Sequence, residues 1–239
     1  MTPTWKDFWI KYRNLEARNE DDLFVQVGKT VKQQPISRAT FQRMVERIVA
    51  LLQLTQGDYL MDFCCGNGLV TYELAPSVSR VMAVDFAEHL VTTARQMKSH
   101  ANISYHVGEV AGFLEACTLQ QPKPSKFLMN DSLAYFDPDE LRKIVLNIQL
   151  CLANLPFRFL ITGIPNSELK SNFYNTPERR ARQQHNEKSS DNTNDGLGRW
   201  WNAKEILLIC EQCGLEVQIE NQPAEISNYR MDALIFARS

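Results

Sequence analysis

The chain has 239 residues, of which 44% are hydrophobic and 23% are charged, and its 26 basic and 28 acidic residues give a formal net charge of −2. These values are typical of one ordinary globular domain, and they exclude an intrinsically disordered chain. The balanced charge and scattered basic residues disfavour nucleic acid as a partner. No apolar stretch approaches the about 20 residues that cross a bilayer, and no leader pattern opens the sequence, so we expect a cytoplasmic protein with no membrane partner.

Residues 1–36 form an N-terminal arm or cap in this interpretation. Aromatic and charged residues alternate here, which predicts a short helix followed by an irregular segment that ends near Pro35. Gly28 and Lys29 stand in an apolar context within this segment. The segment either folds over the mouth of a ligand site or makes an ordinary surface turn.

Residues 37–239 are expected to form one α/β domain. Ser37 precedes an amphipathic helix in which Phe41, Val45 and Ile48 recur on one face. Short apolar runs then alternate with segments of helical period. The expected strands are 59–64, 80–85, 103–108, 126–130 and 157–163, and the expected helices are 69–75, 88–98, 110–117 and 138–152. This alternation predicts a mostly parallel sheet with helices on both faces.

The last part of the chain has a different pattern. A helix is expected at 203–213, and strands at 215–221 and 229–238 are separated by a segment too short for a crossover helix. The last strand should therefore run antiparallel to its neighbour. Residues 167–199 form a polar insertion before the last helix, in which Thr176-Pro177 is a helix-start signal, and this insertion is a candidate substrate lid.

Acidic residues stand at the ends of the first three strands of the expected sheet. Asp62 precedes a turn that contains Gly66 and Gly68, Asp85 ends the second strand, and Glu109 follows the third. Ligands of open parallel sheets bind beyond the carboxyl ends of the strands, where a carboxylate can accept hydrogen bonds from ribose hydroxyls. A single such residue is weak support for a site, but three in register are far more specific.

These motifs, with Asn130-Asp131-Ser132-Leu133 after the fourth strand, resemble those of class I S-adenosylmethionine-dependent methyltransferases. The resemblance implies a Rossmann-like seven-stranded sheet with an antiparallel last strand, S-adenosyl-L-methionine as cofactor, and in-line methyl transfer. The chain departs from the family pattern at Cys64, which replaces a turn glycine, and at Glu109, which replaces an aspartate. The cofactor-binding residues that the resemblance implies are Asp62, Cys64, Cys65, Gly66, Asn67, Gly68, Asp85, Phe86, Glu109, Val110, Asn130 and Ser132.

Methyl transfer needs orientation and exclusion of water more than it needs catalytic groups. A carboxylate or neutral amine acceptor requires no strong base, whereas a hydroxyl acceptor calls for a base or a metal ion. We expect no metal site. His185 and Tyr135 are the candidate catalytic residues, while His89 and His100 are expected to be solvated and His106 to be a satisfied structural group. The candidate substrate residues are Tyr135, Phe136, Tyr174, Arg179 and Trp200, for which a packing role stays open.

The preferred interpretation is a methyltransferase that modifies nitrogen or oxygen on a small molecule. A nicotinamide-dependent oxidoreductase shares the sheet and the ribose carboxylate, but it would require a third glycine where Thr71 follows Gly66 and Gly68. A cofactor-binding protein without catalytic activity is the other alternative, because methyl transfer requires no diagnostic nucleophile.

Overall fold

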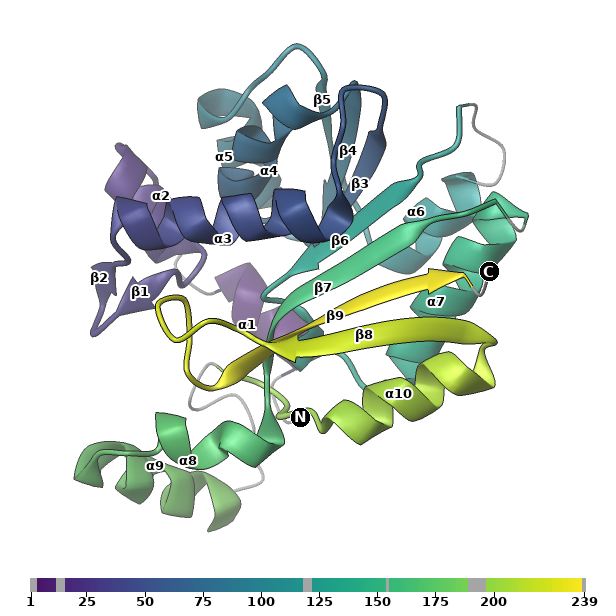
Figure 1. The fold of residues 1–239 in the computed structure, drawn as a ribbon. Helices are drawn as coiled ribbons and strands as arrows, with labels where there is room; N and C mark the ends of the chain where they lie inside the picture. The colour runs from purple at the N-terminus through teal and green to yellow at the C-terminus, as the bar shows by residue number, and fades with distance from the viewer. Residues whose placement is uncertain (1–3, 12–15, 118–121, 154, 189–196, 238–239) are drawn as a thin grey trace.

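The computed structural model describes residues 4–11, 16–117, 122–153, 155–188 and 197–237. Its centre is a seven-stranded sheet in the order β5-β4-β3-β6-β7-β9-β8 (Figure 1). The strands are β3 (Tyr59–Phe63), β4 (Arg80–Asp85), β5 (Ile103–Val107), β6 (Lys126–Asn130), β7 (Arg158–Pro165), β8 (Leu215–Asn221) and β9 (Arg230–Ala237). Strand β9 runs antiparallel to both β7 and β8, which confirms the predicted topology.

Helices cover both faces of the sheet, as expected (Figure 1). One face packs against α3 (Arg38–Leu52), α4 (Leu69–Leu74) and α5 (Glu88–Met97), and the other against α6 (Val110–Cys117), α7 (Pro138–Leu152) and α10 (Ala203–Gln212). Two hydrophobic clusters result, one on each face. In the part of the chain that the structure describes, no helix has both the length and the apolar character that a membrane span requires.

The chain changes direction across the sheet between β3 and β6. From β3 the chain proceeds outward through β4 to β5, and then returns to the other side of β3 to form β6 and β7. This reversal is the topological switch point, where the connections after β3 and β6 leave the sheet on opposite sides and open a crevice. The loops at the carboxyl ends of these strands therefore converge there.

The N-terminal arm is more regular than predicted. After α1 (Trp5–Lys11), the arm contains α2 (Glu20–Gln26) and a hairpin of β1 (Thr30–Val31) and β2 (Gln34–Pro35). Helix α2 begins with a capping box between Asn19 and Asp22. It buries Leu23 and Phe24, and the Phe24 ring lies 4.9 Å from that of Phe41 on α3. Packing against α3 therefore fixes a segment that was expected to be irregular.

The insertion before the last helix contains the predicted short helix. The segment includes the 3₁₀ turn η3 (Ser167–Leu169), α8 (Lys170–Phe173) and α9 (Pro177–Lys188). Pro177 is the first residue of α9, and the Thr176 hydroxyl accepts a hydrogen bond from the backbone N–H of Arg179. Helices α8 and α9 project from the carboxyl edge of the sheet rather than packing on a face (Figure 1).

Candidate functional site

The loops after β3, β4, β5 and β6 line one cavity of about 1020 Å³ at the carboxyl edge of the sheet. This volume lies at the upper end of the range for small-molecule sites, about 300–1,000 Å³. Eleven of the twelve predicted cofactor residues line it, and Gly68 is the exception. The predicted substrate residues Tyr135, Phe136, Tyr174 and Arg179 also line it, whereas Trp200 does not.

The turn after β3 depends on left-handed backbone conformations. Cys64, Gly66 and Gly68 have φ angles of +57°, +55° and +74°, so the turn holds a cysteine in a conformation that favours glycine. A Cβ atom at Gly66 would lie 3.1 Å from the Val27 side chain of the arm. At Gly68 it would collide with the Tyr105 hydroxyl. Gly68 is therefore required for packing beneath the cavity.

Asp85, at the end of β4, is held by two backbone amides. Its Oδ2 accepts a hydrogen bond from the Gly66 N–H at 2.9 Å, and its Oδ1 accepts one from the Ala87 N–H at 2.8 Å. Burial raises the pKa of Asp85, although these two hydrogen bonds oppose the shift. Because a carboxylate has about four acceptor positions, Asp85 retains acceptor capacity toward the cavity.

Asp62 is buried within β3, where it is only 2% exposed. The Thr71 hydroxyl on α4 donates a hydrogen bond to Asp62 Oδ2 at 2.6 Å. Burial raises the pKa of Asp62 to about 7, even though the bond from Thr71 favours the ionised form. Asp62 is thus poised to change its charge near neutral pH.

Asn67 attaches the N-terminal arm to the turn after β3. Its Nδ2 donates hydrogen bonds to the Leu23 carbonyl at 2.8 Å and to the Gln26 side-chain oxygen at 2.9 Å. Asn67 and Gln26 are both buried. Residues 27–32 of the arm consequently line the cavity beside the loop that they touch.

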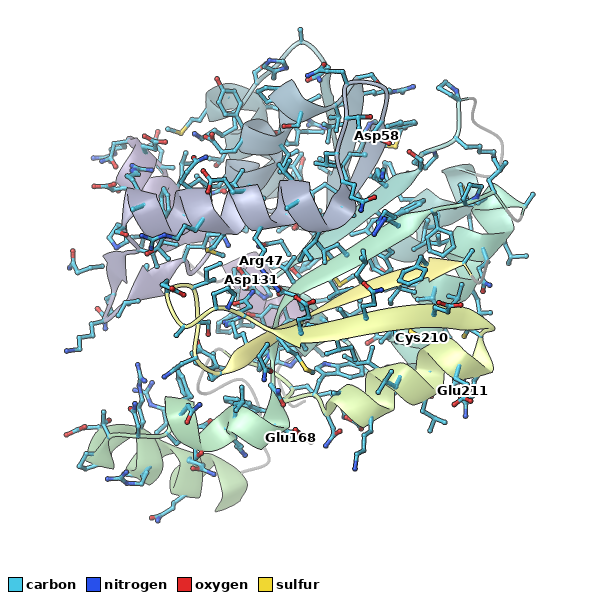
Figure 2. The ribbon with its side chains drawn as sticks, viewed as in Figure 1. Arg47, Asp58, Asp131, Glu168, Cys210 and Glu211 are labelled. Atoms are coloured by element: carbon cyan, nitrogen blue, oxygen red, sulfur yellow. The ribbon has the colours of Figure 1, made fainter. Side chains whose placement is uncertain are left out.

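Lys29, Asp131 and Arg230 form an ion cluster in the cavity wall, which sequence reasoning missed as a unit. Lys29 Nζ lies 2.6 Å from Asp131 Oδ2, and Arg230 Nη1 lies 2.9 Å from Asp131 Oδ1. Arg230 also donates a hydrogen bond to the Gly163 carbonyl. Burial would raise the pKa of Asp131, but the two cations hold it below its ordinary value. Asp131, labelled in Figure 2, follows β6, and Arg230 begins β9, so the cluster joins these two strands to the arm.

Helix α1 lies across the cavity beside Glu109. Lys6 Nζ makes a 2.6 Å ion pair with Glu109. The rings of Trp5 and Trp9 lie 4.8 and 5.5 Å from the Tyr135 ring. No residue of α1 is buried, so these contacts attach the helix to the cavity wall without a core of its own.

Three aromatic rings, those of Phe173, Tyr174 and Tyr229, form a second wall of the cavity. Phe173 lies 5.0 Å from both Tyr174 and Tyr229, measured between ring centroids. Trp200 lies behind them, 5.9 Å from Tyr174 and from Tyr229. Phe173, Tyr174 and Tyr229 line the cavity. The adjacent Trp201 is fully buried and donates a hydrogen bond to the Leu133 carbonyl.

The histidines differ in part from expectation. Nε2 of His89 and Nε2 of His106 are both buried and, among the described residues, have no hydrogen-bond partner. The prediction that His106 is a satisfied group is therefore wrong at Nε2, while His89 is half-exposed with only its Nε2 shielded from solvent. His100 Nδ1 contacts Asn102 Oδ1 at 2.5 Å. His185 belongs to α9, but its side chain lies outside the described part of the structure.

This sheet order, the antiparallel β9 and the convergence of acidic loops at the switch point define a class I, Rossmann-like methyltransferase fold. Two solved structures share it. The magnesium protoporphyrin IX methyltransferase of Synechocystis with bound S-adenosylhomocysteine is 16% identical, with 98% of this chain and 94% of that chain covered and a TM-score of 0.59. A methyltransferase from Anabaena variabilis is also 16% identical, with 93% and 96% covered and a TM-score of 0.61.

A family model described as a methyltransferase domain matches residues 60–154. The matched stretch runs from β3 through α7 and contains the loops after β3, β4, β5 and β6 that line the cavity.

Two curated proteins match shorter stretches of the chain. An S-adenosylmethionine-dependent Diels-Alderase of Neonectria is 33% identical over 69 residues, 29% of this chain. A mouse tRNA (uracil-5-)-methyltransferase homologue is 34% identical over 59 residues, 23% of this chain. The matched regions span only 28% and 10% of these two relatives.

Proposed function

We propose that this protein transfers the methyl group of S-adenosylmethionine to nitrogen or oxygen of a small-molecule acceptor. The observation that carries the proposal is the shared cavity, in which strand-end carboxylates line one part and aromatic rings line another. Its volume of about 1020 Å³ is large enough to hold a cofactor and an acceptor together. Helix α1 and the N-terminal arm partly enclose the cavity, which favours a small acceptor over nucleic acid.

The cofactor would occupy the part of the cavity between β3 and β5. Asp85 would accept hydrogen bonds from the ribose, with Phe86, Glu109 and Val110 around the adenine. Asp62 and the turn at Cys64–Gly66 would hold the methionine part. Lys29 is the cation beside that turn, and we assign it to the methionine carboxylate because it is buried and reaches the same wall.

When bound, S-adenosylmethionine supplies a methyl group that its sulfonium makes electrophilic. The protein's own contribution is then alignment and exclusion of water. Asn130 and Ser132 are held by local bonds, since Thr162 Oγ1 donates to Asn130 Oδ1 and Ser132 Oγ donates to the Asn130 carbonyl. Trp5 and Trp9 cover the nearby Tyr135, which keeps water from that end of the cavity.

The cavity favours an acceptor atom that needs no strong base. Among the described side chains that line it, none is a histidine. Asp131 is a weak base because Lys29 and Arg230 lower its pKa. A carboxylate oxygen or a neutral amine nitrogen fits these surroundings, because neither must lose a proton before it attacks. Tyr135 lines the cavity and stays the candidate to orient such an acceptor, and His185 stays a prediction.

Calorimetric titration with S-adenosylhomocysteine and, separately, with NAD tests this function. We expect binding of S-adenosylhomocysteine alone. Asp85→Ala should weaken it by about 10- to 100-fold, the value of one or two charge-assisted hydrogen bonds. Glu88→Ala, which changes an exposed residue outside the cavity on α5, is the control and should leave the affinity unchanged. Binding of NAD alone, or equal affinities for both variants, would contradict the proposal.

A further inference from the structure

Strand-end carboxylates and three arginines line different parts of the cavity, and Lys6 and Lys29 also line it. The carboxylates of Asp62, Asp85 and Glu109 stand at the ends of β3, β4 and β5. The guanidinium groups of Arg179, Arg182 and Arg230 line the part formed by α9 and β9. Of these three arginines, Arg230 is paired with Asp131, which also binds Lys29. This part of the cavity therefore carries excess positive charge.

Arg179 is a positioned cation without an acidic partner. Its guanidinium carbon lies 4.4 Å from the centroid of the Phe173 ring, and its Nη1 donates a hydrogen bond to the Phe173 carbonyl at 3.0 Å. Among the described residues, no carboxylate lies within ion-pair distance of Arg179. Two contacts thus fix a half-buried guanidinium against the cavity, with donors left for a planar anion.

The rings beside Arg179 form an apolar wall in which the planes of Phe173 and Tyr229 are tilted by 57°. Phe173 and Tyr229 lie 5.0 Å apart, and Tyr174 lies 5.0 Å from Phe173 with its plane at 87°. Rings in such contacts stack against other planar groups. Aromatic rings alone could also bind a cation, but the adjacent Arg179 and Arg182 repel one. The combination favours a planar anion over an amine.

We propose that the acceptor is an aromatic carboxylate, whose ring packs against Phe173 and Tyr229 and whose carboxylate binds Arg179. Arg182, exposed on the next turn of α9, adds positive charge at the same end. This inference rests on the proposed function, because the remaining part of the cavity is assigned to the cofactor. The second half of the cavity would then be the part that recognises an aromatic carboxylate.

The test uses the full chain saturated with S-adenosylhomocysteine and three probes of one shape: naphthalene-2-carboxylate, its neutral carboxamide, and 2-naphthylmethylamine. Ligand-observed NMR titration gives the three affinities. We expect the carboxylate to bind at least about tenfold more tightly than the carboxamide, as a charge-assisted hydrogen bond requires. The amine should bind most weakly.

Two arginine variants identify the cation responsible. Arg179→Gln should lower the carboxylate affinity at least about tenfold and leave the carboxamide affinity unchanged. Arg180→Gln is the matched control, because Arg180 is the exposed neighbour on α9 that does not line the cavity. Unchanged affinity of both variants for S-adenosylhomocysteine shows that the fold is intact.

The outcomes separate this inference from the proposed function. Equal affinities for carboxylate and carboxamide, tightest binding of the amine, or equal losses in Arg179→Gln and Arg180→Gln would overturn the inference while leaving cofactor binding in place. Failure of the wild-type protein to bind S-adenosylhomocysteine would contradict the proposed function, and the inference would fall with it.

Discussion

The ammonium group of Lys29 lies 2.6 Å from Oδ2 of Asp131, 102 positions later in the chain. The Lys29 side chain is 7% exposed and that of Asp131 is 28% exposed, so the ion pair is largely shielded from water. It joins the N-terminal arm to the end of β6 at the wall of the proposed cofactor site.

Replacing Lys29 with methionine should destabilise the protein. The substitution leaves Asp131 with Arg230 as its remaining ion-pair partner, and loss of one member of a shielded pair costs about 1–3 kcal/mol. The free energy of unfolding from urea titration measures this loss. Lys204→Met, at an exposed residue of α10, is the control and should change stability by less than about 0.5 kcal/mol. Equal effects of the two substitutions would show that the ion pair adds nothing.

The Asp62 carboxyl should make stability depend on pH. Its pKa is about 7 in the folded chain, above the about 3.9 of an unfolded aspartate. Between these values the folded chain binds the extra proton, so the free energy of unfolding falls as pH rises from about 4 to about 7. Asp62→Asn removes this dependence.

Urea titrations at pH 5 and pH 8 measure this effect of Asp62. The difference in unfolding free energy between Asp62→Asn and the wild type should shift in favour of the variant by on the order of 2–4 kcal/mol from pH 5 to pH 8. A variant whose stability relative to the wild type is the same at both pH values would show that Asp62 titrates normally.

Gly68→Ala should lower stability by about 2 kcal/mol or more. The added Cβ meets the Tyr105 hydroxyl, and the φ angle of +74° disfavours a side chain. Gly112→Ala is the matched control, because α6 has open space at Gly112 and alanine favours a helix. Thermal unfolding of both variants compares them. A tolerated alanine at Gly68 would contradict the close packing beneath the turn.

Helix α1 should slow dissociation of the cofactor. Trp5 and Trp9 contact Tyr135, yet no residue of α1 is buried. The double substitution Trp5→Ala and Trp9→Ala should therefore leave the melting temperature unchanged and speed release of S-adenosylhomocysteine several-fold in stopped-flow measurements. Ile10→Ala, at a position 53% exposed on the same helix, should change neither quantity. Identical release rates in all three proteins would rule out a covering role for α1.

Most of the sheet was predictable because buried parallel strands are apolar runs bounded by turns. The predicted strands at 80–85, 126–130 and 215–221 match β4, β6 and β8. Helix α2 was not predictable from periodicity, since it is short and begins with Glu20-Asp21-Asp22. Its stability depends on the contact of Phe24 with Phe41, which is a tertiary interaction.

The same dependence on tertiary contacts explains why only part of the site could be predicted from the sequence. Asp62, Asp85 and Glu109 could be grouped because the carboxyl ends of neighbouring parallel strands meet at one edge. Lys29 and Arg230 could not be grouped with Asp131, because no local pattern pairs an arm residue with the start of the last strand. Gly68 was predicted at the cofactor, whereas its contact with Tyr105 depends on the packing of α4 near β5.

A crystal structure of the protein with S-adenosylhomocysteine tests the central claim most directly. We expect the ribose hydroxyls within hydrogen-bonding distance of the Asp85 carboxylate, with the sulfur facing Asn130 and the aromatic wall. A ligand bound away from Asp85 and the turn at Gly66 would contradict it.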